Sequence, residues 1–139
     1  MFRAVLVRTL PVVLVTMAAM LYVVHVEGGS AYPVRNCVPM MLALALSVVV
    51  VYRGGGSWFG RGATWPLAIV GYSIPAIGLS IYLHYGYTTD LHGMFSEAVY
   101  PEELFRYLPI YTVLAGLIGF AIGWIVGRNV DGDMTGDKR

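Results

Sequence analysis

The chain has 139 residues, of which 58% are hydrophobic and 12% charged, and its mean hydropathy is +0.69. Soluble domains usually carry about 25% charged residues, so this composition excludes an ordinary water-exposed surface and predicts one membrane-embedded domain. The formal net charge of +1, without a basic cluster among aromatics, argues against a nucleic-acid partner. The single cysteine, Cys37, excludes an internal disulfide and is expected to pack as a small apolar residue.

Four apolar segments approach the length of about 20 residues that a membrane-spanning helix needs. They cover residues 10–26, 36–52, 65–85 and 107–127. The segments predict an all-α, polytopic integral membrane protein with a four-helix transmembrane domain over residues 1–128 and a polar, disordered tail over 129–139. The second segment is short unless it begins near Val34. The first could be mistaken for a secretory signal, but it is long for a signal core, so a retained span is expected.

Two features of the middle of the chain carry structural information. Residues 53–62 form a glycine-rich linker that lacks the Gly-Lys-Ser/Thr ending of a phosphate-binding loop; both Trp58, in this linker, and Trp65, just after it, are expected at the headgroup level. Pro75 lies in the middle of the third segment and should kink its helix, as a shape element or as a hinge. Ser73 or a neighbouring helix could satisfy the carbonyl that Pro75 frees.

The fourth segment carries small residues at every fourth position: Ala115, Gly119, Gly123 and Gly127. On a helix these four residues form one smooth stripe. Because lipid tails are as apolar as leucine, membrane helices associate through close packing, which small residues permit. The stripe predicts a helix-packing face at which another membrane subunit docks.

The distribution of positive charge predicts the orientation. Placing the amino terminus in the cytoplasm puts seven cations on the inside, whereas Arg35 and Arg106 are the two outside. The inner seven are Arg3, Arg8, Arg53, Arg61, Arg128, Lys138 and Arg139. Because positive residues favour the cytoplasmic side, both termini are expected inside, in the plasma (inner) membrane.

Few residues suggest chemistry. No Asp, Glu, Lys or Arg lies within the four apolar cores, which argues against a proton-coupled antiporter. His25 and His84 end the first and third segments and could ligate haem between helices, although interfacial hydrogen bonding is the commoner role. Together with Asp90, His92, Met94 and Glu97, His84 could also hold a divalent or copper ion.

These features favour a small non-catalytic integral membrane subunit without a cofactor. Its expected partners are membrane lipids and either other integral membrane subunits or copies of itself. A small oligomeric channel or transporter is the first alternative, with the Pro75 helix lining the path. A haem- or metal-binding redox component using His25, His84 and His92 is the second.

Overall fold

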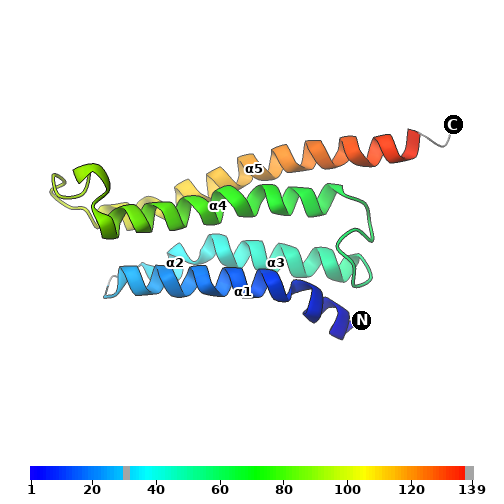
Figure 1. Cartoon of the computed structure of the whole chain (residues 1–139), viewed down its shortest axis with the longest axis horizontal. Helices are drawn as coiled ribbons and strands as arrows, with labels where there is room; N and C mark the ends of the chain where they lie inside the picture. Colours follow the sequence, from blue (N-terminus) through cyan, green and yellow to red (C-terminus); the bar gives the residue numbers. More distant parts are fainter. Residues whose placement is uncertain (30–31, 137–139) are drawn as a thin grey trace.

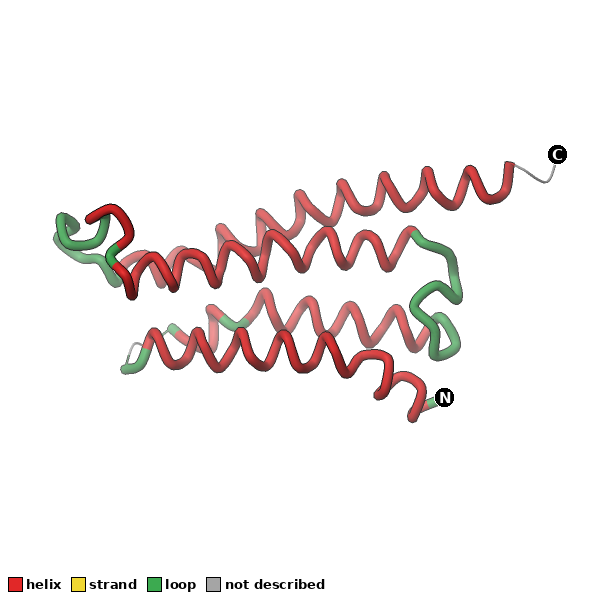
Figure 2. Tube along the Cα trace, viewed as in Figure 1, coloured by secondary structure: helices red, strands yellow, loops and turns green. Residues whose placement is uncertain are grey.

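The computed structural model describes residues 1–29 and 32–136, which are 81% helical and contain no β-strand. The helices in chain order are α1 (Phe2–Glu27), α2 (Pro33–Asn36), α3 (Val38–Arg53), α4 (Thr64–Thr89), the 3-10 turn η1 (Leu91–Gly93) and α5 (Glu103–Gly136) (Figures 1 and 2). The all-α prediction is confirmed for this part of the chain.

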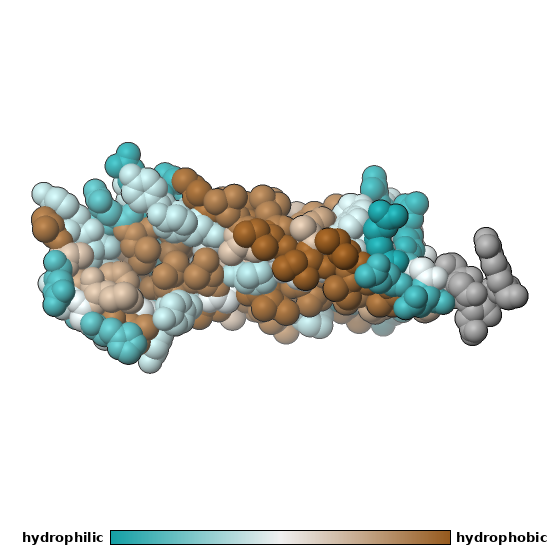
Figure 3. Space-filling model, turned by 90° about the horizontal axis from the view of Figure 1, so that it is seen from above, coloured by the Kyte–Doolittle hydropathy of each residue, from teal (hydrophilic) through white to brown (hydrophobic). Residues whose placement is uncertain are grey.

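Three helices of the described chain, α1, α4 and α5, are long and apolar enough to cross a membrane. Many of their large apolar side chains are exposed. On the face shown in Figure 3, hydrophobic residues fill the middle of the molecule and hydrophilic residues gather toward its two ends. An apolar exterior between polar ends is typical of a membrane protein.

The helix α3 is shorter than the other three. Its 16 residues extend about 24 Å, less than the hydrocarbon thickness of about 30 Å. The short helix α2 lengthens it, because only Cys37 separates the two and keeps a helical backbone conformation with φ −81° and ψ −11°. Together, residues 33–53 extend about 31 Å, which answers the length question raised by the second apolar segment.

The long helices run side by side as two pairs, α1 with α3 and α4 with α5 (Figure 1). Both termini lie at one end of the molecule, together with the α3–α4 connection. The end of α1, the start of α2 and the segment around η1 lie at the other end.

The closest helix contact joins α4 and α5 through glycines. A Cβ atom added to Gly119 would overlap the carbonyl oxygen of Gly71, and one added to Gly123 would overlap that of Leu67. A Cβ added to Gly127 would lie 2.5 Å from the Cα of Thr64. The small-residue stripe therefore faces α4 of the same chain. At its amino-terminal end Gly116, which is buried, faces α4 against Tyr72, whereas Ala115 is only half-buried.

Pro75 belongs to the same contact. Proline removes the hydrogen bond to the carbonyl four residues earlier, here that of Gly71. That oxygen faces Gly119, so α5 covers it, while the Ser73 hydroxyl donates instead to the Ile69 carbonyl. The Pro75 ring also lies against Gly119. Pro75 thus lies in the close contact between α4 and α5, which we call the α4–α5 seam. This packed environment favours a role of Pro75 in shaping the helix over a role as a hinge.

The polar tail departs from expectation. Residues 129–136 continue α5 as a helix, so the prediction of disorder is wrong there, and residues 137–139 lie outside the described part. The Asp131 carboxylate supplies one reason for this order. It accepts hydrogen bonds from the Ala63 amide at 2.7 Å and from the Thr64 amide and hydroxyl at 3.0 and 2.6 Å. Asp131 therefore caps the start of α4 from a neighbouring helix.

Candidate functional site

Polar residues from three helices meet inside the bundle, at the end opposite the termini. Glu27 is the last residue of α1, Asn36 ends α2, and His84 lies in the last turns of α4. All three side chains are buried, and those of Glu27 and His84 have no exposed surface. The buried cluster Glu27–Asn36–His84 is thus withdrawn from solvent although its members lie near helix ends.

The Glu27 carboxylate is the centre of the cluster. Its Oε1 lies 2.8 Å from Nε2 of His84 and accepts a hydrogen bond of 2.6 Å from Nδ2 of Asn36. The Asn36 amide nitrogen also donates to the carbonyl of Phe105 at 3.1 Å, and this contact adds α5 to the cluster. On its other side, Nδ1 of His84 lies 2.7 Å from the carbonyl oxygen of Ser80.

This geometry fixes the protons of the pair. A carbonyl oxygen only accepts, so Nδ1 of His84 carries a proton. The short Nε2–Oε1 contact then needs a second proton between His84 and Glu27, since otherwise two lone pairs would face each other. The pair holds this proton either as carboxylate with imidazolium or as carboxylic acid with neutral imidazole. Both forms are electrically neutral, which suits a buried position.

Aromatic rings close the cluster on the α5 side. The ring of Phe105 stacks on His84 with centroids 5.3 Å apart and an angle of 24° between planes. Tyr87 packs in turn on Phe105 at 4.7 Å. Two buried atoms, Oδ1 of Asn36 and Oγ of Ser80, have no hydrogen-bond partner among the described residues. The site is therefore a buried Glu27–His84 pair that shares a proton, with these two unpartnered polar atoms beside it.

The cluster corrects one premise of the sequence analysis. The first predicted segment ends at residue 26, one position before Glu27, so the sequence predicts no ionisable group within the apolar cores. Fifty-seven positions separate Glu27 from His84, and the sequence around either residue does not indicate that the two are in contact. The sequence offers one indication of this contact: a carboxylate and a histidine lie at the ends of two spans on the same predicted side of the membrane.

The three histidines considered for haem or metal do not converge. His25 is exposed on α1, and His92 is exposed in η1 with a left-handed backbone, φ 58°. Both ring nitrogens of the third, His84, face oxygen atoms within hydrogen-bond distance. In the part of the chain that the structure describes, no three His, Cys, Asp or Glu side chains lie close enough together to hold a metal ion.

Asp90 in the proposed metal loop has a different role in the structure. It ends α4 in a left-handed conformation, and its Oδ1 accepts hydrogen bonds from the amides of Phe95 at 2.9 Å and Ser96 at 3.0 Å. Hydrogen bonding from Ser96, and then from the Phe95 amide, holds the pKa of Asp90 below its ordinary value of 3.8. The carboxylate orders the loop that follows α4.

Comparison with known proteins gives no match to a protein-family model, to a curated protein or to a solved structure.

Proposed function

We propose that this chain is a small non-catalytic subunit of a membrane protein complex, with four spans and both termini on the cytoplasmic side of the inner membrane. Two features support the topology. Both termini lie at one end of the molecule (Figure 1), as an even number of crossings requires. Five of the cations predicted to be cytoplasmic belong to the described chain on that side: Arg3, Arg8, Arg53, Arg61 and Arg128.

The docking surface of this proposal differs from the one expected from sequence. Because α4 fills the glycine stripe of α5, a partner would have to bind elsewhere. A groove of about 430 Å³ lies between α1, α3 and α4. Its walls come from α1, α3, α4 and the α3–α4 connection: Pro11, Val12, Val15, Thr16, Ser47, Trp58, Phe59, Pro66, Ile69, Val70, Ser73, Ile74 and Ile77.

The chemistry of this α1–α4 groove carries the proposal. Three hydroxyls line it, those of Thr16, Ser47 and Ser73, and each donates to the carbonyl four residues earlier in its own helix. The hydroxyl protons are therefore already used, and the remaining wall is apolar. Such a groove suits the apolar face of a partner helix better than a polar solute.

Substitution at the groove tests the proposal. Ile74, 68% exposed, lines the groove, whereas Ile118 on α5 is similarly exposed at 65% and lines none of the cavities described here. Ile74→Trp should remove the partner subunit that co-purifies in mild detergent, and Ile118→Trp should leave it bound. Retention of the partner by Ile74→Trp, or a chain that purifies only by itself, would contradict the docking proposal.

The buried cluster favours a second candidate, a proton-linked transporter. Ionisable residues inside membrane proteins often mark proton paths, and Glu27 and His84 hold one proton between them. In this case purified protein in liposomes would move a solute when a pH gradient is imposed, and Glu27→Gln would abolish the movement. Absence of gradient-dependent flux in the unaltered protein would remove this candidate.

A further inference from the structure

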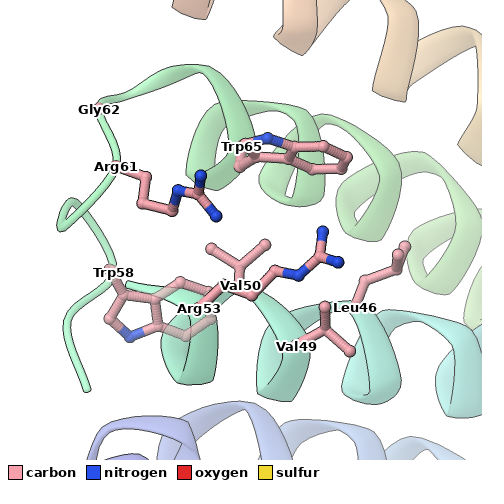
Figure 4. Close-up of a pocket in the computed structure, with 8 residues that line it drawn as sticks. All are labelled: Leu46, Val49, Val50, Arg53, Trp58, Arg61, Gly62 and Trp65. Carbon is pink, nitrogen blue, oxygen red and sulfur yellow. The ribbon is translucent and has the colours of Figure 1, made fainter. Parts of the chain in front are cut away.

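Two arginines converge in a small cavity at the end of the molecule that holds both termini. Arg53 ends α3, and Arg61 lies in the connection just before α4. Their side chains point into the same space, below the ring of Trp65 and facing the turn of α3 that carries Val49 and Val50 (Figure 4). The cavity holds about 50 Å³, room for a small group.

Neither guanidinium group is paired with a carboxylate in the part of the chain that the structure describes. In residues 1–29 and 32–136, neither arginine has a hydrogen-bond or ion-pair partner, and no carboxylate lines the cavity. The carboxylate of Asp131 lies beside Gly62, and its hydrogen bonds come from Ala63 and Thr64. Like charges that converge without a counter-ion repel, so an anion between them lowers the energy. Guanidinium forks match the oxygens of phosphate.

The remaining walls of the cavity are apolar. Leu46, Val49 and Val50 come from α3, and the indoles of Trp58 and Trp65 also line the cavity (Figure 4). Packing fixes Trp65, whose ring lies edge-on to Trp124 of α5 at 4.8 Å. Tryptophan rings favour the headgroup level of a bilayer, so the cavity is placed where lipid phosphates lie.

A second, apolar cavity shares one wall residue with the first. Leu46 also lines this second cavity of about 240 Å³, between α3, α4 and α5. The other walls of this cavity are Leu42, Tyr72, Val113, Leu117 and Phe120. A phosphate beside Arg53 and Arg61 would thus lie above a groove suited to a hydrocarbon chain.

We propose that Arg53 and Arg61 bind the phosphate of an anionic phospholipid, one acyl chain of which lies in the groove between α3 and α5. The site faces the cytoplasmic leaflet, which is rich in anionic lipids, and basic pockets between membrane helices at this level bind such headgroups. The inference rests on the proposed orientation, which places this end of the molecule at the cytoplasmic leaflet, and it holds whether or not a partner subunit docks.

Lipid retention by the whole chain tests the site. The purified protein, released from detergent micelles holding equal phosphatidylglycerol and phosphatidylcholine, should retain phosphatidylglycerol preferentially in native mass spectrometry. Arg53→Gln with Arg61→Gln should lower that preference about 10- to 30-fold. The control, Arg3→Gln with Arg128→Gln, removes the same charge from the same end and should retain the preference.

Other outcomes would overturn the proposal. Equal loss in both double variants would show a general charge effect, and no preference in the unaltered protein would remove the site whatever the variants do. Complete displacement of phosphatidylglycerol by inorganic phosphate at millimolar concentration would indicate a free-anion site. Leu46→Gln, which leaves both arginines in place, should weaken retention of long-chain but not of short-chain phosphatidylglycerol; equal retention would contradict the acyl groove.

Discussion

At the scale of single residues, the backbone of α4 explains why α5 has glycines at the positions that face it, since a side chain there would overlap α4. Gly119 and Gly123 face carbonyl oxygens of α4, and a backbone atom cannot move aside as a flexible side chain can. Sequence alone predicts that this stripe packs against a helix. It does not say which helix, because a partner in the same chain and one in another subunit require the same spacing.

Alanine substitution should separate packed from free glycines. Gly119→Ala places a methyl group against the Gly71 carbonyl and should destabilise the protein by about 1–3 kcal/mol. Gly78 is the matched control, since an added Cβ meets nothing within 4 Å there. Gly78→Ala should be neutral or stabilise α4 by up to about 1 kcal/mol. Thermal unfolding in one detergent compares them, and equal effects would contradict the α4–α5 seam.

The seam also changes what a larger substitution does. If the stripe bound another subunit, Gly123→Leu would block docking while insertion into the membrane continued. Since Gly123 faces Leu67 of the same chain, Gly123→Leu should instead separate α4 from α5 and lower the unfolding temperature of the isolated chain. An unchanged unfolding temperature together with a lost partner would restore the first interpretation.

The buried pair makes a second prediction for single residues. His84→Ala would leave the Glu27 carboxylate buried without its proton-sharing partner, which typically costs about 3–5 kcal/mol. His25→Ala, at an exposed position, should change stability by less than about 0.5 kcal/mol. Chemical or thermal unfolding measures both. Similar stability of the two variants would show that the pair does not hold the helices together.

At the scale of elements, the sequence predicts apolar helices well and their ends poorly. The four apolar segments all contain helices, because membrane spans are long and uniformly hydrophobic. The sequence does not predict that α5 continues over residues 129–136, because these residues are polar. The contact that helps to order them, between Asp131 and Thr64, joins residues 67 positions apart. The α2–α3 break at Cys37 has a local signal in Pro39, a proline at the start of α3.

Removal of the Asp131 cap should loosen the first turn of α4. Asp131→Ala should expose the Ala63 and Thr64 amides and speed their hydrogen exchange, while amides in the middle of α4 stay protected. Asp133→Ala, two positions along the same exposed helix end, is the control and should leave both amides as they are. Unchanged exchange in Asp131→Ala would mean that α4 starts without this cap.

The loop after α4 should respond to acid through Asp90. Its pKa is lowered in the folded chain, so the stabilisation that it supplies is present above the ordinary value of 3.8 and disappears as pH falls through the lowered value. The amide resonances of Phe95 and Ser96 should therefore shift with a midpoint below pH 3.8, and Asp90→Asn should remove the shift. A midpoint at or above 3.8 would contradict the hydrogen bonding described.

At the scale of the whole molecule, α3 decides the topology. Three helices are long enough to span a membrane by themselves, and three crossings would put the termini on opposite sides. The fourth crossing depends on α2 and α3 acting as one span of about 31 Å. The helical geometry at Cys37 and the placement of both termini at one end support four crossings. Charge bias alone predicts the same orientation, but it does not show how a short apolar segment crosses the membrane.

One measurement tests this central claim most directly. A phosphatase that is active only outside the cytoplasm is fused after Arg139 in one protein and within the loop at Glu97 in another. Four spans with both termini inside predict an inactive fusion after Arg139 and an active one at Glu97. Activity after Arg139 would mean that α3 does not cross the membrane or that the orientation is reversed, and would contradict the four-span topology.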